Sequence, residues 1–263
     1  IHRAVTRGLN PDVKLKPSGI PWLGDIPEHW SLRRLKTLTC FVTSGSRGWA
    51  RYYSDTGFLF LRIGNISTTS IDLRMDKMCY VTPPIGAEGN RTRAKTNDVL
   101  LSITAQIGAV GVVPNGIGEA FVNQHTALIR LRTAVSDPRW VAYVLLSRFG
   151  KQQCQLLTNG GTKIGLTLDD VRGLSIVFPP VDEQKLLVAK IEEQSSALNT
   201  AITRLEREIA LLREYRTRLV ADVVTGKLDV REATKNLPDE AVEPEVTTAA
   251  EELSESEPEE AEA

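Results

Sequence analysis

Cysteine is scarce in this sequence, with three residues among 263. Cys40, Cys79 and Cys154 are odd in number, far apart and without CxxC spacing. This arrangement argues against both a disulfide framework and a cysteine zinc site. We expect reduced thiols, as in a cytoplasmic protein.

Long hydrophobic runs are absent as well. The longest strongly apolar stretch, AQIGAVGVV at residues 105–113, is about half the length that a helix needs to cross a bilayer. No signal peptide opens the chain. The sequence therefore predicts a soluble protein of the cytoplasm.

The motifs of common enzymes are also missing. TGKL at residues 225–228 has the Gly-Lys of a phosphate-binding loop, but it lacks the upstream Gly and the following Ser or Thr. There is no Asn-Pro-Pro-aromatic motif of an adenine methyltransferase. The imidazole bases available, none beside a candidate nucleophile, are His2, His29 and His125. We therefore predict no catalytic residue, no metal site and no cofactor bound by this chain.

Charge is distributed unevenly, although the whole chain is nearly neutral. Residues 232–263 contain twelve Asp or Glu and one Lys, so residues 1–231 carry a net charge of +10 where the full chain carries −1. A basic body suits a polyanionic partner such as nucleic acid. The last residues, rich in Pro, Glu, Ala, Ser and Thr, cannot bury enough apolar surface to fold, so we expect a disordered acidic tail over 229–263.

Residues 16–180 have the pattern of a mixed domain, and the expected fold class is α+β. FLFLRI at 58–63 and ALIRL at 127–131 are short apolar runs bounded by Gly, Asn, Pro and Thr clusters, which is typical of strands. Residues 138–157 have apolar side chains at helical intervals and follow Asp137, a suitable N-cap. They are predicted to form one helix.

Residues 181–228 are predicted to form one long helix. No Pro or Gly occurs from 182 to 225, Asp182 can cap the start, and Gly226 ends the pattern. Such a rod is about 64 Å long at 1.5 Å per residue, too long to bury its apolar stripe against one small domain. Ile or Val alternating with Leu in heptads suits a two-stranded coiled coil with a second helix. We name the stripe the heptad residues: Val188, Ile191, Leu198, Ile202, Leu205, Ile209, Leu212, Leu219 and Val223.

Two similar sequence segments flank the globular part and the long helix, AVTRGLNPDV at residues 4–13 and VVTGKLDV at 223–230. Residues 1–15 are therefore predicted to be the end of an upstream helix with its linker. On this interpretation the chain is one unit of a tandem repeat, a globular domain followed by a helix. A chance match between two short strings at helix ends is the alternative.

Three segments carry a resemblance to the specificity subunits of type I restriction-modification systems. SGIPWLGDIPEHWSLRRLKTL at residues 18–38 resembles the start of a target recognition domain in that family. VFPPVDEQKLLVAKIEEQ at 177–194 resembles the start of its conserved spacer helix, and YRTRLVADVVTGKLDVRE at 215–232 resembles the end. Between them, LRIGNI, NDVLLSITAQIGAVGVV and FVNQHTALIRL follow the order usual in such a domain.

The resemblance implies a non-catalytic chain that selects a DNA sequence for partner subunits. A subunit of this family has two target recognition domains and two antiparallel spacer helices, whereas this sequence has one of each. It is thus similar to the C-terminal half of a subunit, or to a half-length version that dimerises. Modification subunits would flip and methylate an adenine with S-adenosylmethionine, and a restriction subunit would cleave DNA with ATP and Mg²⁺. The alternatives are a coiled-coil assembly adaptor with a protein-binding head, and a free-standing nuclease or methyltransferase.

Reading duplex DNA requires cations for the phosphates and polar side chains for the base edges. Four loops combine such residues, at 43–53, 89–98, 123–125 and 159–163, and the first and last are the leading candidates. The residues expected to bind DNA are Ser44, Ser46, Arg47, Trp49, Arg51, Asn90, Arg91, Arg93, Lys95, Asn159, Thr162 and Lys163.

Each loop also has a structural interpretation, because surface turns generally contain Gly, Ser, Asn and charged residues. Gln124 and His125 in the third loop are expected to form core or sheet-end hydrogen bonds instead of reading bases. Trp22, Trp30 and Trp140 are expected to be packing residues, which leaves Trp49 as the one tryptophan predicted at the DNA.

Overall fold

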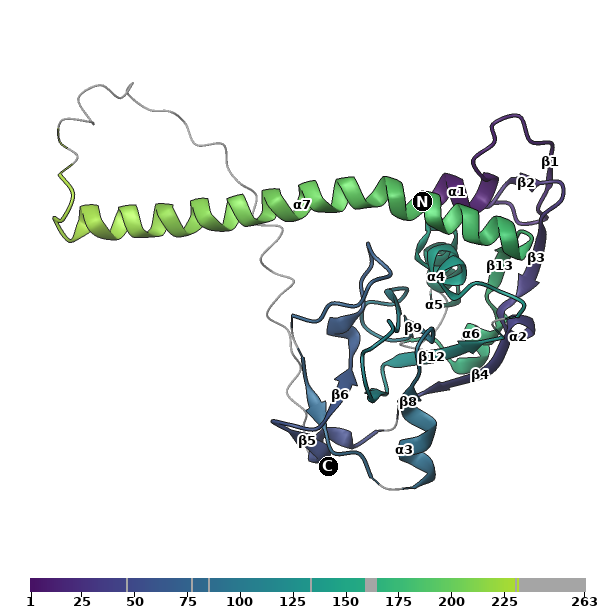
Figure 1. Cartoon of the computed structure of the whole chain (residues 1–263), viewed down its shortest axis with the longest axis horizontal. Helices are drawn as coiled ribbons and strands as arrows, with labels where there is room; N and C mark the ends of the chain where they lie inside the picture. The colour runs from purple at the N-terminus through teal and green to yellow at the C-terminus, as the bar shows by residue number, and fades with distance from the viewer. Residues whose placement is uncertain are drawn as a thin grey trace. The chain divides into compact units, whose positions relative to one another are not determined.

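The structure is a computed structural model, and it describes residues 1–45, 47–76, 78–84, 86–132, 134–158, 165–229 and 231 (Figure 1). The chain divides into two compact units, Ile1–Leu198 and Asn199–Ala263. The first unit has the predicted α+β fold, and the later turns of a long helix lie in the second. The predicted tail lies outside the described residues from residue 232 onward.

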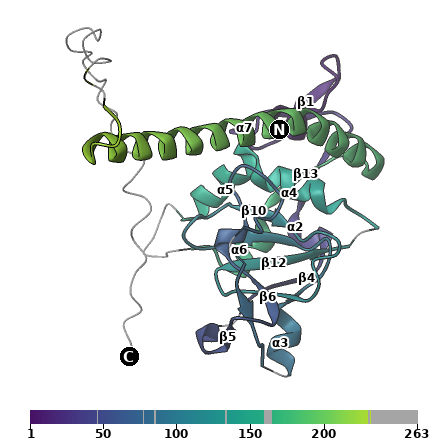
Figure 2. The same cartoon turned by 60° about the vertical axis from the view of Figure 1, so that its left-hand side comes forward.

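The first unit is built around a four-stranded antiparallel sheet. Alternate side chains of this sheet enter two different cores. Val99 and Leu101 pack with the helices α4 (Pro138–Leu146) and α5 (Arg148–Thr158), while Leu100 packs against a second sheet. In both views the helices α4 and α5, the four-stranded sheet and the second sheet follow one another as successive layers (Figures 1 and 2). The strands in spatial order are β10 (Val110–Val112), β9 (Val99–Ser102), β12 (Thr126–Leu131) and β4 (Thr39–Ser44).

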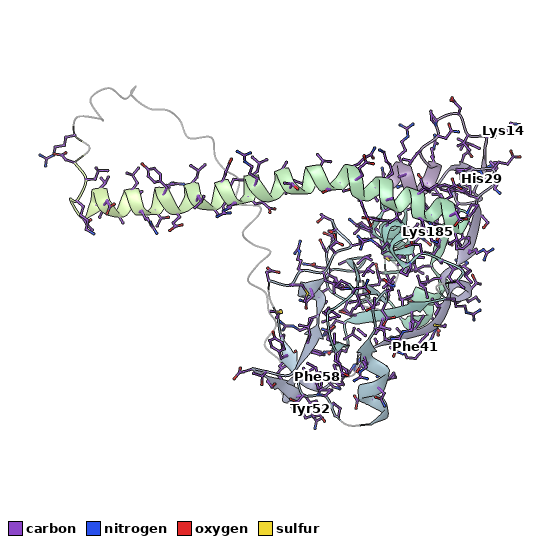
Figure 3. All side chains as sticks on the ribbon, viewed as in Figure 1. Lys14, His29, Phe41, Tyr52, Phe58 and Lys185 are labelled. Atoms are coloured by element: carbon purple, nitrogen blue, oxygen red, sulfur yellow. The ribbon has the colours of Figure 1, made fainter. Side chains whose placement is uncertain are left out.

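The second sheet has five short strands and is mixed, because β6 and β11 run parallel while the other pairs are antiparallel. In spatial order these are β5 (Tyr53–Ser54), β7 (Tyr80–Val81), β6 (Phe58–Leu61), β11 (Ala120–Val122) and β8 (Arg93–Ala94). Tyr52 and Phe58 lie together at this end of the unit in Figure 3. The strands predicted from FLFLRI and ALIRL are confirmed as β6 and β12.

The single helix predicted for residues 138–157 is wrong, because the segment forms two helices, α4 (Pro138–Leu146) and α5 (Arg148–Thr158). Asp137 caps α4 as expected, since its Oδ1 accepts hydrogen bonds from the backbone N–H groups of the first turn. The break is at Ser147, whose backbone is extended (ψ 165°). A Cβ at Gly150 would lie 2.1 Å from the Leu145 carbonyl oxygen, so glycine permits the tight crossing of α5 over the end of α4.

Small elements complete the first unit. Strand β3 (Ser31–Arg34) pairs with β13 (Ser175–Phe178), and β1 (Leu15–Pro17) pairs with β2 (Asp25–Pro27). The residues predicted to be a helix end form α1, which contributes the fully buried Val5 to the main core. The remaining short helices are α1 (His2–Arg7), α2 (Leu35–Leu38), η1 (Trp49–Tyr52), η2 (Ile63–Asn65), α3 (Ala87–Thr92) and α6 (Leu168–Gly173).

Two hydrogen-bonded carboxylate contacts attach the long helix α7 (Val181–Val224) to the segment around Trp30. The buried Trp30 indole N–H donates to Glu183 Oε1 over 3.1 Å, and the His29 ring donates from Nε2 to Glu183 Oε2 over 2.9 Å. His29 and Lys185 both lie at the start of α7 in Figure 3. Trp30 and Trp140 are packing residues as predicted, with rings 5.8 Å apart, whereas Trp22 is 43% exposed.

Gln184 makes a second attachment at the start of α7. Its Oε1 accepts from the Asp137 backbone N–H over 3.0 Å and from the Ser136 hydroxyl over 3.4 Å. Its Nε2 donates to the Pro179 carbonyl over 2.9 Å. The side chain is fully buried, and both the oxygen and the nitrogen of its amide have hydrogen-bond partners inside the core.

The heptad residues do not all have the surroundings that the sequence predicted. The prediction that Val188 and Ile191 contact a second helix is wrong. Both residues are buried in the main core of the first unit, because the first turns of α7 pack on the domain itself. The heptad residues from Leu198 to Leu219 are between 37% and 66% exposed, and Val223 is half-buried. Within the described ranges, α7 included, no helix is long and apolar enough to span a membrane.

Candidate nucleic-acid interface

Residues from two of the four predicted loops, 43–53 and 123–125, line one concavity of about 400 Å³ at the end of the four-stranded sheet. The segment after the fourth loop, beginning at Gly165, lines it too. The side chains around it are mostly small, polar or cationic. The lining residues are Ser44, Gly45, Arg47, Ile103, Thr104, Gln124, His125, Gly165, Leu166, Thr167 and Leu168.

Strand register explains why these segments meet. Ser44 at the end of β4 faces Ala127 near the start of β12, and Ser102 at the end of β9 faces Thr126. The loops after β4 and β9 and the turn before β12 therefore lie at the same end of the sheet. Residues from distant parts of the sequence become neighbours there.

Backbone hydrogen bonds join the loops to one another. The Gly45 N–H donates to the Asn123 carbonyl over 3.0 Å, the Ile103 N–H donates to the His125 carbonyl over 3.0 Å, and the Leu166 N–H donates to the Ile103 carbonyl over 2.8 Å. A Cβ at Gly45 would lie 2.2 Å from the carbonyl carbon of Asn123, so only glycine allows this approach. The concavity is thus held by the main chain.

The first predicted loop contributes Ser44 and Arg47 to the concavity, and Arg47 is exposed. Arg51 is exposed as well and donates from Nε to the Gly48 carbonyl over 3.2 Å. Ser46 lies outside the described residues.

The prediction that Trp49 contacts DNA is wrong. The side chain is 2% exposed and stacks on Phe60 with ring centroids 5.7 Å apart. Its indole N–H donates to Glu88 over 3.1 Å. A flanking glycine and arginines made the residue look like a surface aromatic, but Trp49 fills the core beneath the five-stranded sheet together with Phe60, Val81 and Phe121.

The candidate residues of the second predicted loop have different surroundings. Arg91 donates to the Thr43 hydroxyl and, over 2.6 Å, to the Ser44 carbonyl, which brings its guanidinium to the end of β4 next to the concavity. Asn90 and Lys95 are exposed, and Arg93 is ion-paired with Glu119 on the surface. None of these three is among the residues that line the concavity.

The third loop contains residues that sequence reasoning assigned only a structural role. His125 Nδ1 lies 2.8 Å from the Thr104 hydroxyl, and its Nε2 lies 3.0 Å from Gln124 Nε2, so the expected hydrogen bonds are present. Both side chains nevertheless line the concavity and are half-buried. The available signal was a polar NQH triplet within an apolar stretch.

For the fourth loop, Asn159, Thr162 and Lys163 lie outside the described residues. The chain resumes at Gly165, whose φ of +119° and close approach to the Ile103 carbonyl require glycine. Thr167 follows and caps α6 by accepting from the Asp170 backbone N–H. Sequence reasoning missed Thr104 and Thr167 as lining residues.

The first unit thus has a concavity, lined mainly by polar and small residues, among the loops of an α+β domain, and a long helix follows this domain in the chain. Residues 63–210, more than half of the chain, match the family described as Type I restriction modification DNA specificity domain. The chain belongs to that family, as the motifs around residues 18–38 and 177–194 predict.

The chain is similar to proteins of two organisms. It is 22% identical over 238 residues to the type I restriction enzyme MjaX specificity subunit of Methanocaldococcus jannaschii, covering 88% of this chain and 50% of that protein. It is 21% identical over 215 residues to the type I restriction enzyme EcoBI specificity subunit of Escherichia coli, covering 80% of this chain and 44% of that protein. The chain spans about half the length of the curated relatives it matches.

The fold has a counterpart among solved structures. A chain in a structure on complex assembly and conformational transition of the type I R-M system has a TM-score of 0.52 and 22% identity, covering 72% of this chain and 45% of that chain. This likeness supports the fold, a mixed α/β domain followed in the chain by a long helix.

Proposed function

We propose that this chain recognises one half of a bipartite DNA target and directs partner subunits to it. The observation that carries the proposal is that the loops after β4 and β9 and the turn before β12 meet at one concavity lined by Ser44, Arg47, Thr104, Gln124 and His125. Residues 1–231 carry a net charge of +10, which suits a polyanion. Membership in a DNA specificity family supports the same conclusion.

The chemistry of the concavity and its border suits duplex DNA. Arg47 and Arg51 are exposed cations on one loop, and Arg91 adds a guanidinium at the end of β4. Arginines neutralise phosphates and bond to guanine edges, while hydroxyl and amide side chains bond to base edges in the groove. Because the loops are joined through their backbones, the main chain that carries these groups is preorganised, which reduces the entropy that the loops lose on binding.

The later part of α7 is proposed to pair with a second spacer helix, from an upstream half or from a second copy of the chain. The exposed heptad residues from Leu198 to Leu219 would form the contact. Val188 and Ile191 take no part in it, since they are buried in the domain. Pairing would hold two recognition domains on two half-sites of one duplex.

The chain is proposed to be non-catalytic and to act in the cytoplasm. Modification subunits would flip and methylate an adenine using S-adenosylmethionine, and a restriction subunit would cleave DNA using ATP and Mg²⁺. The specificity chain would supply the sequence choice to both.

Duplex binding by the full chain at two salt concentrations tests the proposal. A DNA reader loses affinity as salt rises, with a slope of log K against log[salt] of about −0.9 per phosphate contacted. A coiled-coil adaptor with a protein-binding head would show little affinity at either salt concentration and would overturn the proposal. Modified or cut DNA from the purified chain with S-adenosylmethionine or Mg²⁺ would contradict the non-catalytic role.

Arg47→Ala tests the assignment of the concavity. If Arg47 reads a base, its truncation relaxes one base position by about 1 to 3 kcal/mol, whereas loss of a phosphate contact weakens all sequences alike. Mapping methylated adenines after purification with the modification subunit measures which occurs. An unchanged target preference together with unchanged affinity would exclude Arg47 from the interface.

A further inference from the structure

We infer that Gln124 reads the edge of an adenine, with His125 and Thr104 holding its amide in the required orientation. The inference rests on the proposed function, because it assigns a base-reading role to one side chain of the concavity. It reverses the structural role that the sequence suggested for the Gln-His pair.

Gln124 and His125 are the central residues of the tight turn between β11 and β12. The turn is closed by the Thr126 N–H, which donates to the Asn123 carbonyl over 3.3 Å, and by the Thr126 hydroxyl, which donates to Asn123 Oδ1 over 2.9 Å. The chain passes here from the five-stranded to the four-stranded sheet. Sheet strands thus fix the turn at both of its ends.

Neighbouring loops hold the same turn from outside. The Asn123 N–H donates to the Leu61 carbonyl over 3.1 Å, and its carbonyl accepts from Gly45 over 3.0 Å. The His125 carbonyl accepts from the Ile103 N–H over 3.0 Å. The Gln124 side chain therefore leaves from a rigid backbone, as a specific contact with a base requires.

The hydrogen bonds of the three side chains have one consistent direction. The Gln124 Nε2 amide can only donate, so the His125 Nε2 at 3.0 Å accepts. His125 then carries its proton on Nδ1 and donates to the Thr104 hydroxyl at 2.8 Å. In this arrangement the nitrogen end of the Gln124 amide faces the histidine.

Among the residues that the structure describes, two groups of Gln124 have no hydrogen-bond partner, the Oε1 acceptor and the second N–H of Nε2. An acceptor beside a donor matches adenine, which presents the N6 amino group as a donor and N7 as an acceptor in the major groove. Guanine presents two acceptors there, O6 and N7, and would leave Oε1 without a donor. The fixed amide therefore favours adenine over guanine.

The position of the pair supports a role in binding as well as in structure. Both side chains line the concavity and are half-buried, whereas the structural amides Gln153 and Gln184 are buried. Ser44, Arg47 and Thr167 line the same concavity and offer further polar groups to neighbouring positions of the DNA.

The test is a selection of bound sequences by the full chain from a pool of DNA duplexes with one randomised segment. The wild type is expected to select a motif that contains an adenine which depends on Gln124. Gln124→Ala is expected to reduce the preference for adenine at that one position by about 5- to 150-fold and to leave the other positions unchanged. Gln155→Ala, an exposed glutamine of α5 outside the concavity, is the matched control and should leave the motif intact.

A modified base tests the contact itself. 7-Deazaadenine at the selected position lacks the N7 acceptor, so it should weaken binding by the wild type and have no further effect on Gln124→Ala. Thr104→Val removes the hydroxyl that holds His125 while keeping the side-chain shape. It should reduce adenine preference at the same position only, which a general loss of stability would not do.

The outcomes separate the two proposals. If the wild type selects no motif, the proposed DNA-reading function fails. If it selects a motif that Gln124→Ala leaves unchanged, the function stands and this inference is overturned. A uniform loss of affinity in Gln124→Ala, with no change in any base preference, would equally overturn it.

Discussion

The first and the later turns of α7 carry apolar residues at the same heptad spacing, yet these residues have different surroundings. Val188 and Ile191 are 6% and 3% exposed and belong to the main core of the first unit. Leu205 and Leu212, further along the same helix, are 56% and 66% exposed. Heptad spacing identifies the apolar face of a helix, but the neighbouring structure decides what covers each part of that face.

The difference begins with polar contacts that hold the first turn of α7 to the domain. Glu183 accepts from Trp30 and His29, and the buried Gln184 bonds to the segment that precedes α4. These bonds place Leu187, Val188 and Ile191 against the core. Later turns of α7 lack comparable partners among the described residues, and their apolar side chains stay exposed.

The largest expected effect separates the two parts of α7 by stability. Ile191→Ala leaves a cavity in the main core and should lower the free energy of unfolding by about 2 to 5 kcal/mol. Ile202→Ala, the same substitution at a residue that is 51% exposed, should change it by less than about 0.5 kcal/mol. Urea unfolding of the full chain measures both.

Alkylation of Cys154 offers a second measurement, because its thiol lies in the same core as Ile191. Burial raises the pKa of Cys154 to about 11, so the folded protein keeps the thiol protonated and unreactive. Its alkylation in mild urea should accelerate in Ile191→Ala and not in Ile202→Ala. Equal stability of the two variants would contradict the distinction between the buried and exposed heptad residues.

A smaller effect tests the polar attachment. Gln184→Ala leaves the Asp137 N–H and the Pro179 carbonyl without their buried partner and should cost about 1 to 3 kcal/mol of stability. Gln194→Ala, at an exposed position further along α7, is the matched control. If thermal unfolding shows the same midpoint for both variants, hydrogen bonds of Gln184 do not hold α7 to the domain.

Much of the fold could be predicted from local signals. The long helix begins after Pro179 and Pro180 and ends before Gly226, because these residues interrupt or cap helices whatever surrounds them. The break between α4 and α5 had no such signal. It involves a close approach of Gly150 to the Leu145 carbonyl, which the spacing of apolar residues does not reveal.

Loops of the candidate site could be predicted from their composition, but which segments meet at one concavity could not. Gly, Ser and Arg in the loop around Arg47 indicated a surface that can approach DNA, but local composition could not distinguish the exposed Arg47 from the buried Trp49. The position of Gln124 in the concavity follows from the register of β4, β9 and β12, which places a short polar turn beside the other loops. The register between distant strands cannot be predicted from the sequence of any one segment.

The smallest effect on stability should accompany a large effect on helix pairing. Leu212 is a heptad residue and Leu211 is not, although both are exposed, at 66% and 56%. Leu212→Asp and Leu211→Asp should each change the unfolding of the first unit by less than about 0.5 kcal/mol, because neither side chain belongs to its core. Only Leu212→Asp places a charge at the predicted helix contact, where it should weaken pairing with a second copy or an upstream half. Sedimentation velocity of the full chain, alone and mixed with the upstream half, measures the pairing. Equal loss in both variants would mean that a broader face of α7 makes the contact, and no loss in either would exclude the exposed heptad residues from it.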